Sequence, residues 1–390
     1  MRKLLALFLT ALLVLGAVPA LADTVTLKVW GSQENQAVLG VLINEFKAAN
    51  TDTTWDISLG VVGEPDAKSR YLEDPAAAAD VFSFANDQLM DLVNADALYE
   101  VTVNLDAITA ANTAGSVESG TLGEYLYGYP FNADNGYFLY YDKSVFTDED
   151  IKTLDTLLAA ANKAGKKVFM DVSNGWYISS FFLGAGGTLG LDENGKQTCD
   201  FNNEAGIAAG EAIRAFCADP AFLTGEDSVL VGGMGGSIAA GVSGTWNAAS
   251  IQEKLGDNYA AAPLPTFTCG GEQVHMASFI GTKLIGVNTQ TAHPLEAMKL
   301  AEYLTNESSQ LKFFTERALG PTNINVVANP AVQENEALAA LAAQSAYGVS
   351  QKHVLSNYWS PAEAFGTAME DKSTDDMKTM LDMMVEQITQ

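Results

Sequence analysis

The sequence has few positive charges, and this shortage excludes two classes of partner. Lysine and arginine together number 21, against 48 aspartate and glutamate residues, which gives a net charge of −27. So acidic a surface repels nucleic acid and anionic lipid, and we expect neither as a partner. A neutral ligand or a cationic one remains compatible with this charge.

Cysteine and histidine are equally scarce, with three residues of each. Three cysteines are too few for a disulfide scaffold; Cys199 and Cys217 could pair in an exported chain and leave Cys269 free, or all three could stay unpaired. The histidines are scattered, and no Gly-x-Ser-x-Gly motif or metal-ligand spacing accompanies them. We therefore expect no catalytic nucleophile, no metal and no cofactor.

Long hydrophobic runs are absent except at the N-terminus. There, Arg2 and Lys3 precede an apolar run, 4–18, and a small-x-small ending at Ala20-Leu21-Ala22. This pattern predicts a secretory signal sequence cleaved after Ala22, because the apolar run is too short to span a bilayer. No cysteine follows the cleavage point, so we expect a periplasmic or secreted protein without a lipid anchor.

A chain of this length exceeds the usual size of one hydrophobic core, so we expect two lobes. Apolar residues alternate over 24–30, recur at helical spacing over 36–50, and form strand-like runs at 57–62 and 80–84. Strand and helix alternation predicts an α/β lobe with a largely parallel sheet, whose ligand loops follow the carboxyl ends of the strands. The segments 30–36 and 84–87 lie at such ends.

The segment 126–146 carries a resemblance to a known family. Its parts Leu126-Tyr127-Gly128-Tyr129-Pro130 and Tyr140-Tyr141-Asp142-Lys143-Ser144-Val145-Phe146 resemble the segment by which carbohydrate-binding extracellular solute-binding proteins, the maltose and maltodextrin group, cross between lobes. The polar residues 132–136 read as a short break between two strands. Asp134, the single acid in that break, is expected to face the cleft.

The resemblance implies a two-lobed type II periplasmic-binding-protein fold, with a mixed or parallel sheet flanked by helices in each lobe and a ligand cleft between them. It places 23–132 and 280–320 in the N-terminal lobe, and 133–279 and 321–390 in the C-terminal lobe. The implied function is capture of an oligosaccharide by lobe closure and delivery to the membrane permease of an ABC importer. The partners would be the sugar and the permease, and the protein would be a monomer.

Sugar sites pair aromatic rings, which cover the apolar faces of the sugar, with carboxylates and amides that bind its hydroxyls. Matched to the family segment by segment, the sequence offers both kinds of group, and we expect the rings to approach the sugar from opposite lobes. The candidate ligand-binding residues are Gln33, Glu34, Gln36, Phe84, Asp87, Asp134, Trp176, Tyr177, Trp246, Trp359 and Phe365.

Several of these residues also have a purely structural interpretation. Asp87 could cap the following helix, and Trp359 and Phe365 compete for one role, with core packing open to either. Two other functions remain open as well. The carboxylates Glu34, Asp87 and Asp134 could serve an exported glycoside hydrolase, and acids with aromatic rings could enclose a polyamine or another cation.

Overall fold

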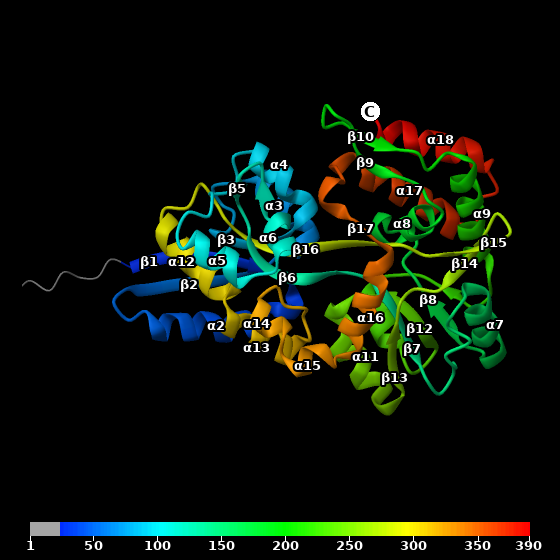
Figure 1. Ribbon diagram of the computed structural model, residues 1–390, viewed down its shortest axis with the longest axis horizontal. Coiled ribbons are helices and arrows are strands. Elements are labelled where there is room, and N and C mark those ends of the chain that lie inside the picture. The colour runs from blue at the N-terminus through cyan, green and yellow to red at the C-terminus, as the bar shows by residue number, and fades with distance from the viewer. Residues whose placement is uncertain (1–23) are drawn as a thin grey trace, which may run out of the picture.

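The computed structural model describes residues 24–390, which form two lobes joined by extended strands (Figure 1). The predicted signal sequence, 1–22, lies outside the described residues. None of the helices in the described part of the chain is both long and apolar enough to cross a membrane.

The first lobe contains a mixed sheet in the order β17-β16-β3-β1-β2, with β6 paired to β16. Strands β1, β2 and β3 are parallel, as predicted, and β16 runs antiparallel to β3. Its elements before the first crossing are β1 (Thr24–Gly31), α2 (Gln36–Ala49), β2 (Thr54–Val61), α3 (Ala67–Glu73), β3 (Val81–Ala85), α4 (Leu89–Asn94), α5 (Leu105–Ala111), α6 (Ala114–Ser119), β4 (Thr121–Leu122) and β5 (Tyr125–Leu126).

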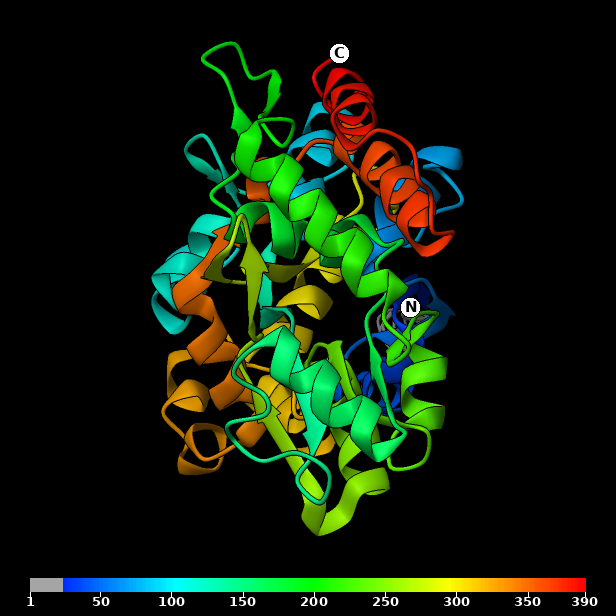
Figure 2. The ribbon, with the colours of Figure 1, turned by 90° about the vertical axis from the view of Figure 1, so that its right-hand side faces the viewer.

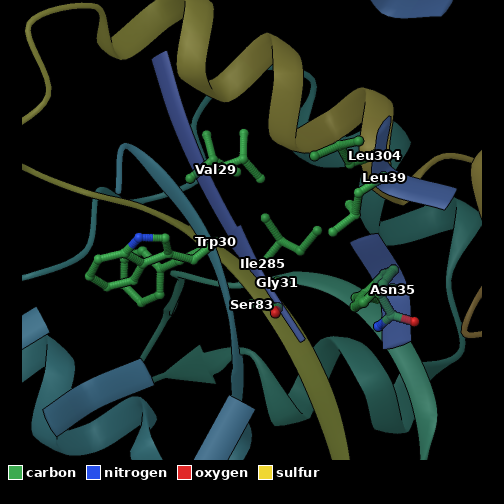
Figure 3. Close-up of a pocket in the computed structure, with 11 residues that line it drawn as sticks. Val29, Trp30, Gly31, Asn35, Leu39, Ser83, Ile285 and Leu304 are labelled. Carbon is green, nitrogen blue, oxygen red and sulfur yellow. The ribbon is translucent and has the colours of Figure 1, made fainter. Parts of the chain in front are cut away.

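The core of this lobe follows from the apolar alternation in β1. Val25, Leu27 and Val29 point to one face and are buried against α2 and α12 (Pro294–Thr305), whereas Trp30 packs on the other face beside Phe82. Figure 3 shows Val29 and Trp30 on opposite sides of the strand. Trp30 is therefore a packing residue of a strand end.

The second lobe is built on a five-stranded sheet in the order β11-β8-β12-β7-β13. Helix α9 packs against β11 of this sheet, and the C-terminal helix α18, drawn in red in Figure 2, packs against α9 and α17. The buried methionines of α18 are core residues of the lobe. Its elements between the two long crossings are β7 (Phe138–Asp142), α7 (Leu154–Ala164), β8 (Lys167–Phe169), α8 (Gly175–Gly184), β9 (Leu189–Leu191), β10 (Gln197–Cys199), α9 (Glu204–Ala218), β11 (Phe222–Leu223), α10 (Asp227–Gly233), β12 (Ile238–Ser243), α11 (Ala248–Leu255), β13 (Tyr259–Ala262), β14 (Thr266–Cys269) and β15 (Glu272–His275).

After the return crossing, the chain completes both lobes. Helix α13 packs on the first lobe, and the chain then passes to the second lobe, where α16 packs against β13 and the last two helices pack against each other. These elements are α13 (Glu307–Arg317), α14 (Ile324–Val327), α15 (Pro330–Gln333), α16 (Glu336–Gln344), β17 (Gly348–Ser350), α17 (Trp359–Glu370) and α18 (Met377–Ile388).

Two long strands, β6 (Tyr129–Gly136) and β16 (Ser278–Val287), connect the lobes and pair antiparallel with each other (Figure 1). In β16, Ile285 belongs to the first core and Phe279 to the second; in β6, Tyr129 and Phe131 belong to the first core, and Tyr137 of the second core follows the strand directly. A third passage follows α13, where the Ala133 N–H donates to the Gly320 carbonyl at 3.0 Å. The predicted lobe boundaries at 132/133 and 279/280 fall inside the two strands, and we keep the division as a proposal.

The supposed break at 132–136 is wrong, because these residues continue β6 as strand. Asp134 lies on this strand and is fully buried. Its Oδ2 accepts hydrogen bonds from the Thr245 hydroxyl (2.6 Å) and the Gly320 N–H (2.7 Å). The expectation that Asp134 faces a cleft is therefore wrong: its carboxylate joins three segments of the chain that meet at the crossing.

Candidate functional site

Five side chains from both lobes and the crossing meet where the lobes contact each other, and we call this set the interlobe junction. It consists of Asp87, Gln351, Trp176, Trp246 and Lys283. Asp87 comes from the first lobe, the two tryptophans from the second, Lys283 from the crossing strand β16, and Gln351 from the segment after β17.

Trp176 is positioned by the start of α8. The Asn174 side chain caps this helix by accepting from the Trp176 N–H at 3.0 Å. Gly175 has its backbone against α17, where an added Cβ would lie 3.3 Å from the Trp359 carbonyl. This close approach accounts for a glycine directly before the tryptophan.

Trp246 is positioned by the turn after β12, a 3₁₀ turn at Thr245–Asn247. Its indole folds back over Gly244, where a Cβ would lie only 2.0 Å from the ring, so only glycine fits there. The indole Nε1 donates to the Asp227 carboxylate at 2.8 Å, and the Trp246 carbonyl accepts from Arg317 at 3.0 Å. These contacts hold the ring in one orientation.

The two indoles lie together, with ring centroids 5.8 Å apart and planes inclined by 39°. Both are half-buried, so part of each ring is accessible. The expectation that the rings come from opposite lobes is wrong, because α8 and the turn after β12 both belong to the second lobe.

Gln351 links this aromatic pair to the first lobe. Its carbonyl Oε1 accepts from the Trp176 indole at 2.9 Å, and its amide Nε2 donates to the Asp87 carboxylate at 2.7 Å. Because an indole N–H can only donate, this arrangement fixes which end of the amide faces Asp87. Burial raises the pKa of Asp87 to about 6, although the hydrogen bond from Gln351 acts in the opposite direction.

The segment that carries Gln351 contacts the first lobe at two further points. Lys352 pairs with Glu118, and the Ser356 hydroxyl donates to Asp91 at 2.7 Å, beside the Lys68 ammonium. Leu355 is held on the second lobe, because its N–H donates to Gln197 at 2.6 Å. The segment 351–356 therefore ties one lobe to the other.

The other predicted site residues lie away from the junction or inside the cores. Gln33 and Glu34 are exposed on the turn after β1, and the Gln36 amide donates to the backbone carbonyl of Gly31 at 2.8 Å, so its role is to hold that turn. Phe84 is fully buried in the first core and Phe365 is buried beside Phe182, which overturns both as ligand rings.

Tyr177 and Trp359 pack against neighbours in the second lobe. Tyr177 is buried edge-on to Tyr137, and burial raises its pKa well above the ordinary value. Trp359 is half-buried and packs edge-on against Tyr358 and Phe279. Of the eleven predicted residues, the structure brings Asp87, Trp176 and Trp246 together at the junction.

Three residues that form contacts at the junction were not predicted from the sequence: Gln351, Lys283 and Asp227. Lys283 had a usable signal, since it is the single charged residue in the ten-residue strand β16. Asp227 is the first residue of α10 and Gln351 begins a 3₁₀ turn, and neither position had a distinguishing signal in the sequence.

Two cavities lie elsewhere in the protein, and none of the eleven predicted residues lines either of them. One, of about 10 Å³, is enclosed in the first core and is too small for a sugar (Figure 3). The other, of about 360 Å³, lies beside α11, β13 and α16. Within residues 24–390, no group of three or more His, Cys, Asp or Glu side chains could hold a metal ion, and all three cysteines are free thiols.

Two α/β lobes joined by paired strands, with half-buried aromatic rings where the lobes meet, define a solute-binding protein. Residues 42–340 match the family of bacterial extracellular solute-binding proteins, and the chain belongs to this family. The predicted family and the type II periplasmic-binding-protein fold are thus confirmed.

Proteins similar to this chain include two that are named for the sugar they bind and one that was solved with acarbose. The chain is 27% identical over 384 residues to the galactooligosaccharide-binding protein of Bacillus subtilis (strain 168), covering 92% of this chain and 88% of the relative. It resembles a structure solved with acarbose (TM-score 0.87, 32% identity), with 94% and 99% of the two chains covered. It also resembles the maltodextrin binding protein MalE1 from L. casei BL23 solved without ligand (TM-score 0.77, 25% identity), with 94% and 100% covered.

Proposed function

We propose that this protein captures an oligosaccharide at the interlobe junction and delivers it to the permease of an ABC importer. The observation that carries the proposal is the pair of accessible indoles, Trp176 and Trp246, surrounded by the polar groups of Asp87, Gln351 and Asp227. Aromatic faces match the apolar faces of a sugar, and carboxylate and amide groups bind its hydroxyls. The names of two similar proteins, and the acarbose in the third, support the same class of ligand.

Sugar binding would act through the equilibrium between separated and closed lobes. A ligand that contacts Asp87 on one lobe and the indoles on the other binds the closed form more tightly, so it shifts the population toward that form. The closed surface would then be recognised by the permease. We propose a monomer that is exported, with its signal sequence cleaved after Ala22.

We propose that the sugar is released unaltered. A glycoside hydrolase needs two carboxyl groups that flank the scissile bond. Of the three acids considered, Asp134 is sealed inside the crossing and Glu34 is exposed on a separate turn, so only Asp87 lies at the junction. The other carboxylate there, Asp227, is engaged by the Trp246 indole N–H. This distribution favours binding over hydrolysis.

A thermal-unfolding screen with maltotriose, maltotetraose and a galactosyl-lactose trisaccharide tests the proposal. A binder should show a rise in Tm that grows with sugar concentration, and chromatography after overnight incubation should recover the sugar intact. Absence of any shift at millimolar sugar would refute sugar capture, and released products would show an enzyme instead.

A further inference from the structure

Lys283 is a largely buried lysine whose ammonium is not fully enclosed and has no acceptor among residues 24–390. The residue is only 8% exposed, and its backbone is fixed between β3 and β6, opposite Ala85 and Asn132. Among the described residues, its side chain forms no ion pair and no hydrogen bond. Its Nζ lies 4.9 Å from the centre of the Trp246 ring, and this is its one polar or aromatic partner.

This environment leaves the N–H donors of the ammonium available. An ammonium carries three N–H donors, and a cation–π contact uses none of them as a hydrogen bond to an acceptor. The Asp227 carboxylate, which lies against the same ring, is bonded to the indole Nε1.

A sugar bound at Trp246, as proposed above, would place acceptor oxygens next to the Lys283 ammonium. Trp246 is at once the ring over which Lys283 sits and half of the indole pair proposed to stack on the sugar. Arg317, whose Nε is buried without a partner, donates to the Trp246 carbonyl, so a second positive charge lies beside the same residue. Oxygen atoms of a ligand at Trp246 would satisfy the ammonium, whereas a positively charged ligand would be repelled.

We propose that Lys283 is a specificity-determining residue of the binding site. Its ammonium donates hydrogen bonds to oxygen atoms of the sugar unit that lies against Trp246, and its charge excludes cationic solutes from that position. This inference depends on the proposed function and adds the class of ligand: a polyhydroxylated unit without an ammonium group.

Binding affinity in three variants tests the role of the charge. Lys283→Met keeps the length of the side chain and should weaken binding of maltotriose or the galactosyl-lactose trisaccharide, whichever binds better, by about 10- to 100-fold. Lys283→Arg keeps the charge and should recover part of the affinity. Lys254→Met, on the exposed surface of α11, is the matched control and should bind as the wild type does. Spermidine should not bind the wild-type protein.

Nuclear magnetic resonance of lysine-labelled protein separates ligand contact from a structural role. The ¹³Cε signal of Lys283, identified by its absence in Lys283→Met, should be displaced by the indole ring and should move when the sugar is added. The Lys254 signal should stay in place. A residue that only supports the fold would not respond to sugar in this way.

The two possible failures are distinguishable. If sugars bind the wild type but Lys283→Met binds them equally well and the Lys283 signal does not move, only the role of Lys283 is refuted. If spermidine binds and no sugar does, the proposed function fails, and the role of Lys283 fails with it.

Discussion

Replacing Trp246 by alanine should weaken sugar binding without unfolding the protein. Loss of a stacking ring in a binding site costs about 1–3 kcal/mol, which corresponds to a roughly 5- to 150-fold increase in Kd. The substitution also removes the ring beneath Lys283 and the donor to Asp227, so we expect the upper half of this range. Trp246→Phe keeps a ring and loses the N–H, so its effect should be about 0.5–1.5 kcal/mol.

Trp55→Phe is the matched control. Trp55 lies on β2 in the first lobe, packs against Phe46, and donates its indole N–H to the Asn50 carbonyl at 2.8 Å. Trp55→Phe therefore loses an indole N–H hydrogen bond, as Trp246→Phe does, but at a residue outside the interlobe junction. Its sugar affinity should equal that of the wild type.

Isothermal titration calorimetry with the sugar that raises Tm most gives the affinities, and circular dichroism with thermal unfolding checks that each variant is folded. The reasoning would be refuted if Trp246→Ala and Trp176→Ala, both folded, bound the sugar as tightly as the wild type. An equal loss in Trp55→Phe would also contradict the proposed location.

Three further predictions concern the junction and the crossing. Gln351→Leu leaves the Trp176 indole and the Asp87 carboxylate without partners, so sugar affinity measured by calorimetry should fall by about 1–3 kcal/mol; an unchanged Kd would contradict the link. The pKa of Asp87 is raised to about 6, so between about pH 4 and pH 6 the folded state holds a proton that the unfolded state has lost; the destabilisation from this group grows over that range and is complete above pH 6. Asp87→Asn should therefore gain Tm relative to the wild type at pH 7 and lose most of that advantage at about pH 4, and the reverse trend in paired melts would refute this sign. Thr245→Val removes a buried donor to Asp134 and should lower the free energy of unfolding in urea by about 1–3 kcal/mol, whereas a stability equal to the wild type would show that the bond is dispensable.

The spacing of apolar residues predicted several strands and helices correctly, because residues that face a core must be apolar at regular intervals. The alternation in β1 and the helical spacing in α2 place their apolar side chains in one core, and the methionines of α18 fill another. These elements are decided by local pattern, which a single sequence displays.

The site was harder to predict because it depends on which side of a strand a residue occupies and on contacts over long separations. Asp134 and Phe84 stand in segments that match the family, yet both side chains point into protein interior. Gln351 reaches Asp87 across 264 positions of sequence. Trp176 and Trp246 were expected to approach the sugar from opposite lobes, yet both rings stand in the second lobe with their centroids 5.8 Å apart, a contact between positions 70 residues apart that local pattern does not display.

The pairing of β6 with β16 has a consequence for the mechanics of the molecule. Two hydrogen-bonded strands form a ribbon that flexes easily perpendicular to its plane, since such flexing leaves the ladder intact, whereas shear along the strands would break bonds. The lobes should therefore reorient mainly about one axis. The rate of this motion should be limited by solvent friction and by side-chain contacts between the lobes, because no hydrogen bond between β6 and β16 has to break.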